Sequence, residues 1–129
     1  MEAVAAVVVI AVAMPPMLYS LQQAHRHNAD QILASRARWL AAEKLEDVIA
    51  DRHASGRGYP YIAAVNYPAE QSVAGFAGFS RSVAITETGP DLSAAGSGYK
   101  TVMCSVGYLD GRGAARTLTI STVVTEYSK

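Results

Sequence analysis

Residues 3–13 read AVAAVVVIAVA, and this unbroken apolar run decides the fold. The apolar character continues to Leu21, and Glu2 is the only charged side chain before that point. A helix needs about 20 apolar residues to cross the hydrocarbon core of a bilayer, and the segment reaches that length as one unit. We expect one helix, bent at the Pro15-Pro16 pair, because proline removes a backbone hydrogen bond inside a helix.

The apolar segment is open to three interpretations. It is a membrane anchor that packs against copies of itself, a cleaved secretory signal ending at Ala11-Val12-Ala13, or a buried helix of a soluble domain. A signal peptide begins with a basic region, whereas this sequence has an acid at position 2. We therefore favour the membrane anchor.

Glu2 is the candidate assembly residue. A lone carboxylate at the head of an apolar helix is costly in hydrocarbon, and such groups usually have a partner. The spacing leaves two roles open. Glu2 lies in the headgroup region, where the helix dipole favours an acid, or it pairs inside the membrane with a cation of another subunit.

Residues 24–51 have apolar side chains at the three- and four-residue spacing of an amphipathic helix. These are Leu33, Ala37, Leu40, Ala41, Leu45, Val48 and Ile49. The charged side chains fall mainly on other faces, and we interpret them as a solvated surface. Trp39 lies off the apolar stripe, and we expect it to pack on a sheet or on a neighbouring subunit. Gly56 and Gly58 predict the end of a helix of about 50 residues, about 75 Å long.

Three later segments alternate between apolar and polar side chains, a pattern typical of strands with one buried face. They are residues 79–86, 99–109 and 116–125. Asp110-Gly111-Arg112-Gly113 is a turn sequence, so the last two strands should form a hairpin. Cys104 lies in the second strand and, as the only cysteine, is interpreted as a small buried hydrophobic residue.

The connecting segments are less regular. Residues 59–78 contain scattered prolines, glycines and aromatic side chains, and predict an ordered loop with one short strand. Residues 87–98 are rich in Gly, Ser and Ala and predict a mobile loop. The expected fold class is α+β, with a long N-terminal membrane-anchoring helix packed on a small antiparallel β-sheet.

The expected organisation is a transmembrane or filament-core helix over residues 1–21, an amphipathic continuation over 22–55, and a loop with three to four strands over 56–129. The 129 residues contain 11 basic and 11 acidic side chains, so the net charge is zero. This balance argues against nucleic acid as a specifically bound partner.

The start of the chain resembles the N-terminus of type IV pilins, pseudopilins and their minor relatives. In that family Phe-Thr-Leu and a hydrophobic residue precede a glutamate and the membrane helix, and Met1 and Glu2 match the last two of these positions. The basic leader and its Gly-Phe-Thr-Leu are absent from this sequence. Residues 34–46, ASRARWLAAEKLE, are similar to the segment that follows the anchor in minor pseudopilins of type II secretion.

The resemblance implies an assembling subunit. Its partners would be other pilin or pseudopilin subunits and inner-membrane lipid, and its anchor helices would bundle into a filament core. The resemblance also implies that Glu2 pairs with the N-terminal amine of a neighbour. The implied location is the inner membrane, crossed once, with the C-terminal domain in the periplasm or in an extracellular filament.

Other motifs give no catalytic, cofactor or metal assignment, and we interpret the chain as a non-enzyme. His25 and His27 point about 200° apart on a helix and cannot share a metal, and His53 is distant in sequence. Glu87 and Asp91 flank the glycine-rich loop, but two acids are too few to predict a calcium site.

Two other functions compete with filament assembly. The first is a single-pass anchored protein that does not polymerise and binds a partner through the loop of residues 59–79. The second is a secreted domain released after Ala13.

Overall fold

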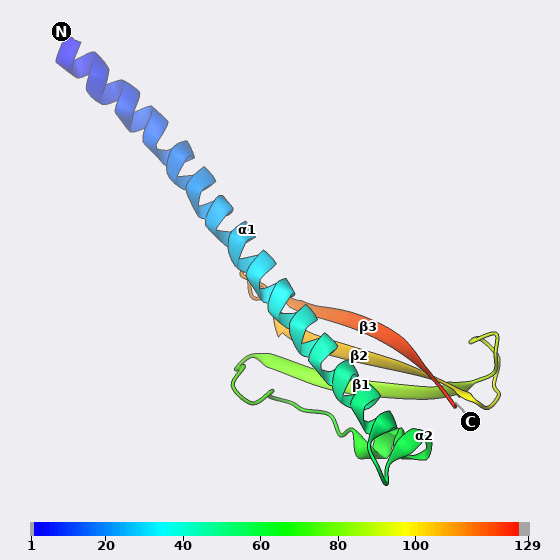
Figure 1. Cartoon of the computed structure of the whole chain (residues 1–129). Helices are drawn as coiled ribbons and strands as arrows, with labels where there is room; N and C mark the ends of the chain where they lie inside the picture. Colours follow the sequence, from blue (N-terminus) through cyan, green and yellow to red (C-terminus); the bar gives the residue numbers. More distant parts are fainter. Residues whose placement is uncertain (1, 127–129) are drawn as a thin grey trace.

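The computed structural model describes the backbone of residues 2–126 and the side chains of residues 7–126. Its elements are α1 (Glu2–His53), α2 (Gly58–Tyr61), the 3₁₀ turn η1 (Ala64–Asn66), β1 (Phe79–Thr88), β2 (Tyr99–Leu109) and β3 (Ala115–Thr125). The C-terminal part of α1 lies on the three strands, and its N-terminal part projects away from them (Figure 1). The expected α+β arrangement is therefore confirmed.

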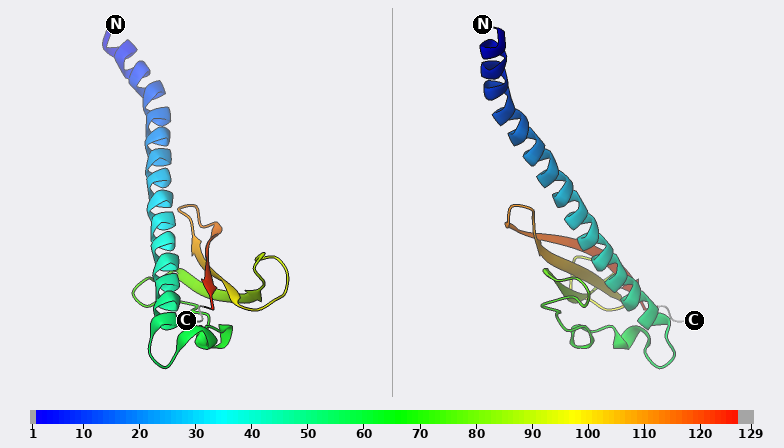
Figure 2. Two further views of the ribbon diagram at one scale, coloured as in Figure 1. Left: turned by 45° about the vertical axis from the view of Figure 1, so that its right-hand side comes forward. Right: turned by 90° about the vertical axis from the view of Figure 1, so that its left-hand side faces the viewer.

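The helix α1 is continuous through Pro15 and Pro16. At 1.5 Å per residue its 52 residues span about 78 Å. Both views of Figure 2 show the axis bending in the N-terminal part. The ring of each proline clashes with the carbonyl four residues earlier. The helix bends away from the two rings to relieve the clash, and it continues beyond them.

The three strands form one antiparallel sheet in the order β1-β2-β3. Leu109 pairs with Ala115, so the predicted hairpin between β2 and β3 is confirmed. The strand β1 runs two residues further than expected, because Glu87 and Thr88 also pair with β2.

The core lies between the sheet and the C-terminal half of α1. The predicted stripe is buried from Ala37 to Val48, whereas Ile49 is 41% exposed at the edge of the contact. From the sheet, Val102, Cys104 and Val106 face the helix and are fully buried. The interpretation of Cys104 as a buried hydrophobic residue is confirmed.

The loop before the sheet differs from the prediction, because it contains the turns α2 and η1 in place of a short strand. Its strand-like pairing is limited to two isolated bridges, Glu70 with Arg81 and Val73 with Phe76. The physical reason lies in its glycines: Gly75 and Gly78 adopt positive φ angles that turn the chain and stop a strand from extending.

Candidate functional site

The N-terminal part of α1, up to Leu21, is an apolar rod whose described side chains no other element covers. Every residue from 7 to 28 is exposed or nearly so on all sides of the helix. The large apolar side chains among them are each more than half exposed: Val7, Val8, Val9, Ile10, Val12, Met14, Met17, Leu18 and Leu21. Within the described residues, α1 is the one helix long and apolar enough to cross a membrane. A soluble protein rarely leaves so large an apolar surface uncovered.

The predicted assembly residue, Glu2, is the first residue of α1. Its side chain lies outside the described side chains, so its predicted pairing stays a prediction. The helix itself places Glu2 at the end of the rod, about 40 Å from the first contact of α1 with the sheet at 1.5 Å per residue.

That first contact joins α1 to the turn between β2 and β3. The Gly111 N–H donates to Asp30 Oδ1 at 2.7 Å. A Cβ at Gly111 would lie 3.0 Å from the same oxygen, so only glycine fits this close approach without a shift. The turn is braced by Asp110, whose carboxylate accepts from the Arg112 and Ala114 N–H groups, both at 2.9 Å. These bonds, that of Ala114 first, lower the pKa of Asp110.

Removing this contact should loosen the turn from the helix. In the Asp30→Ala variant we expect the Gly111 amide to exchange with deuterium about fivefold faster, because one hydrogen bond is worth about 1 kcal/mol. Asp30→Asn is the matched control, since its side-chain oxygen still accepts the bond. Equal exchange in the wild type and Asp30→Ala would show that the contact does not hold the turn.

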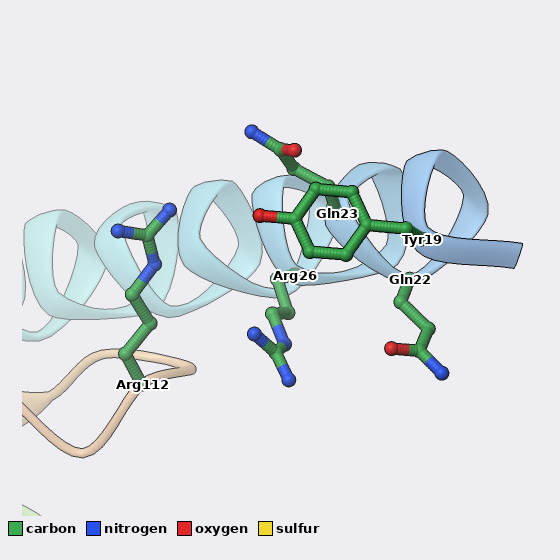
Figure 3. A pocket seen from close by; sticks show the side chains of 5 residues that line it. All are labelled: Tyr19, Gln22, Gln23, Arg26 and Arg112. Carbon is green, nitrogen blue, oxygen red and sulfur yellow. The ribbon is translucent and has the colours of Figure 1, made fainter. Parts of the chain in front are cut away.

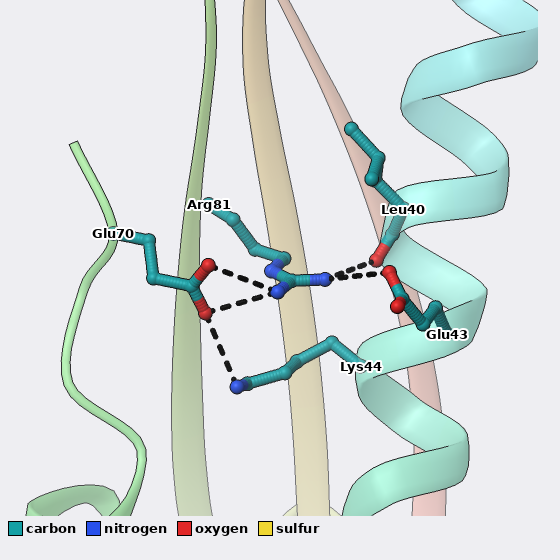
Figure 4. Close-up of polar contacts among 5 residues, drawn as sticks. All are labelled: Leu40, Glu43, Lys44, Glu70 and Arg81. Carbon is teal, nitrogen blue, oxygen red and sulfur yellow. Dashed lines mark hydrogen bonds and ion pairs between the residues drawn. The ribbon is translucent and has the colours of Figure 1, made fainter. Parts of the chain in front are cut away.

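A cluster of four charged side chains joins α1, β1 and the loop (Figure 4). The Arg81 guanidinium donates to both oxygens of Glu70, at 3.0 and 2.9 Å. It also donates to the Leu40 carbonyl of α1 at 3.0 Å and to Glu43 at 3.2 Å. The Lys44 Nζ atom lies 3.1 Å from Glu70 Oε1, which makes Lys44 the fourth charged group of the cluster. The helix is therefore fastened to the first strand by charge as well as by apolar packing.

Five of the six charged residues between positions 36 and 47 are exposed, as the interpretation of a solvated face expects, and the cluster corrects that interpretation for Lys44. Glu43 remains exposed, but Lys44 is half-buried and both reach across to other elements. The signal was present in the sequence: Arg81 alternates with Phe79 and Val83, which places its charge on the inward face of β1. A buried arginine requires acceptors, but which ones depends on the tertiary fold.

Electrostatics in the cluster favour the charged forms. Burial alone would raise the pKa of Glu70, but the hydrogen bonds from Arg81 and Lys44 outweigh it and the pKa is lowered. Burial alone would lower the pKa of Arg81, but the bonds and charges of Glu70 and then Glu43 raise it. Both shifts favour the charged forms of Glu70 and Arg81, so the ion pair between these two side chains persists at neutral pH.

A second buried cation fastens the loop to the sheet. Lys100 of β2 is 8% exposed and donates to the Tyr59 and Ile62 carbonyls at 3.1 and 2.8 Å. Its ammonium group also lies 4.3 Å from the Tyr59 ring centroid. Burial, followed by the charge of Glu87, raises the pKa of Tyr59 to about 12. The aromatic loop is therefore an ordered part of the domain.

Trp39 packs on an aromatic side chain of the loop. The centroid of its ring lies 5.6 Å from that of Phe76, and the ring centroids of Phe76 and Phe79 lie 6.5 Å apart. Trp39 nevertheless remains 55% exposed. A half-exposed tryptophan on a rigid helix is the kind of residue that a partner protein covers.

The residues considered for metal binding do not converge. The described residues contain no group of three or more His, Cys, Asp or Glu side chains that could hold a metal. Asp91 accepts instead from Ser93 and Ala94 of its own turn, and Glu87 accepts from the Tyr59 hydroxyl at 3.3 Å. Asp91 thus stabilises its own turn, whereas Glu87 at the end of β1 connects the sheet to α2.

Comparison with known proteins returned no relative: no family model, no curated protein and no solved structure matches this sequence. Its function therefore has to be inferred from its own residues and from the arrangement described above.

Proposed function

We propose that this protein is a structural subunit, a minor pilin or pseudopilin, of a type IV pilus or type II secretion filament. The observation that carries the proposal is the bare apolar rod of α1, which continues without a break into the folded domain. An apolar surface exposed on all sides of a helix can be covered by lipid and later by the same helices of neighbouring subunits. One surface thus serves in both environments.

The charged cluster supports this role, because it makes the connection between rod and domain stiff. Arg81 ties the sheet and the loop to Leu40 and Glu43 on α1. A filament needs each domain at a constant position relative to its core helix, so that copies stack in register. In the proposed location, α1 crosses the inner membrane once and the domain lies in the periplasm or in the extracellular filament.

Disulfide crosslinking in membranes tests the assembly. A cysteine in place of Val8 lies on the rod, and the native Cys104 is fully buried and does not compete. We expect oxidation of membranes containing Val8→Cys to give dimers and higher oligomers. Adding Glu2→Ala should lower their yield at least about tenfold, because an ion pair in lipid has no water to replace the lost partner.

Glu46→Ala is the matched control, since it removes an exposed acid from the same helix outside the rod. Its crosslinking yield should equal that of Val8→Cys alone. Recovery of monomer only, or an equal yield with and without Glu2, would contradict the proposed assembly.

A second candidate function rests on the exposed Trp39 and its contact with Phe76. In this alternative the protein is a single-pass anchored binding protein that does not polymerise and uses the loop of residues 59–79. A fragment of residues 25–129 keeps the whole buried core, which begins at Ala37, and the partly buried Leu33 that packs against it. Tight capture of a partner other than a pilin by this fragment, lost in Trp39→Ala, would favour the alternative.

A further inference from the structure

A hollow of about 230 Å³ lies where the rod meets the folded domain. Its lining is polar: Tyr19, Gln22, Gln23 and Arg26 come from α1, and Arg112 comes from the turn between β2 and β3. The four helix residues follow the i, i+3, i+4, i+7 spacing and therefore share one face. Figure 3 shows Arg112 reaching alongside the helix from the turn and Arg26 extending from the helix on the side of the turn.

The two arginines bring positive charge to the hollow. Among the side chains of residues 7–126, no acid lies within ion-pair distance of Arg26 or Arg112. The nearby carboxylates are engaged elsewhere: Asp30 accepts from Gly111, and Asp110 accepts from the turn amides and from Arg116 at 3.0 Å. An anion that enters the hollow would meet two guanidinium groups and amide donors from two glutamines.

The face of α1 that lies roughly opposite, beginning about one turn nearer the N-terminus, is apolar. Met14, Met17, Leu18 and Leu21 share it, again at i, i+3, i+4, i+7 spacing. The hollow therefore begins where the apolar run ends. Along the helix axis, Arg26 lies about 7.5 Å from Leu21, toward the folded domain. Tyr19 stands at the boundary, where a ring with one polar end is favoured at the surface of a bilayer.

We propose that the hollow binds the phosphate of an anionic phospholipid, with Arg26 and Arg112 as the charged ligands and Tyr19, Gln22 and Gln23 as hydrogen-bonding neighbours. Guanidinium groups bind phosphate oxygens through paired, charge-assisted hydrogen bonds. The site rests on the membrane anchoring in the proposed function, which places the hollow at headgroup depth. Its role is to set the height and tilt of the folded domain on the membrane before the subunit leaves it.

Native mass spectrometry of the full chain in detergent micelles tests the site, with phosphatidylglycerol and the zwitterionic phosphatidylcholine as the two lipid probes. We expect phosphatidylglycerol to be retained in preference to phosphatidylcholine. Arg26→Gln and Arg112→Gln should each weaken phosphatidylglycerol binding about tenfold, the effect of losing one charged hydrogen bond. Arg38→Gln is the control, because Arg38 is exposed on the same helix outside the hollow. Circular dichroism of all three variants should match the wild type, which checks that the fold is kept.

Three results would overturn the proposal: equal retention of the two lipids, unchanged retention in Arg26→Gln and Arg112→Gln, or an equal loss in Arg38→Gln. Inorganic phosphate that displaces phosphatidylglycerol at equal concentration would show that the ligand is soluble phosphate and would overturn the lipid assignment. The crosslinking of Val8→Cys is measured independently of lipid binding, so that the lipid site and the assembly are tested separately. A chain that crosslinks without lipid preference contradicts only the lipid site, and a chain that prefers phosphatidylglycerol without crosslinking contradicts only the assembly.

Discussion

Replacing Val12 with arginine is expected to move the protein out of the membrane fraction. Val12 is 71% exposed near the middle of the apolar rod, and it makes no contribution to the folded core. An arginine at the centre of a spanning helix raises the free energy of insertion by about 3 kcal/mol, a shift of more than a hundredfold in the insertion equilibrium. Carbonate extraction of membranes followed by immunoblotting measures the change.

Val65→Arg is the matched control, because Val65 is 84% exposed on the folded domain and the same charge is added there. This variant should remain in the membrane pellet. If Val12→Arg also remains there after extraction, residues 1–21 do not span a bilayer, and both the anchor and the filament core fail as explanations of the rod.

Replacing Arg81 with methionine is expected to lower the free energy of unfolding by about 2–3 kcal/mol. Methionine keeps most of the side-chain volume but loses the bonds to Glu70, Glu43 and the Leu40 carbonyl. Breaking a fully buried ion pair costs about 3–5 kcal/mol, and the cost is smaller here because Glu70 and Glu43 keep some contact with water. Urea unfolding of the 25–129 fragment, followed by circular dichroism, measures the loss.

Arg38→Met controls for the general effect of removing an arginine, and it should change stability by less than about 0.5 kcal/mol because Arg38 is exposed. Adding Glu70→Gln to Arg81→Met should cost less than the sum of the two single changes, because the pair is coupled. Equal stability of Arg81→Met and Arg38→Met would mean that the cluster does not hold the helix on the sheet.

The features that the sequence predicts correctly depend on interactions between neighbouring residues, whereas the others depend on contacts between residues far apart in the chain. The helix and strands were predictable because the signals that specify them lie within a few residues of one another. The apolar run, the three- and four-residue spacing up to Val48 and the alternation in β2 each act on neighbouring side chains. The Asp110-Gly111-Arg112-Gly113 turn is equally local, and its hairpin formed as expected.

The loop of residues 59–78 was the least predictable part of the fold. Its expected strand did not form, because Gly75 and Gly78 turn the chain. The loop is held instead by side chains of the sheet: Arg81 of β1 binds Glu70, and Lys100 of β2 binds the Ile62 carbonyl. Isolated sequence patterns carry no information on such partners. The same reason explains why the spacing of the charged residues on α1 does not reveal that Lys44 pairs with Glu70.

By itself, the sequence determined a long helix with a bare apolar end, an antiparallel hairpin and a buried Cys104, because periodicity and turn chemistry act over short distances. The tertiary structure alone decided that Arg81 is bound from both sides, and that Arg26 of the helix and Arg112 of the turn line one hollow. These contacts join residues far apart along the chain. Their geometry depends on how the helix lies across the sheet, and no local pattern records that.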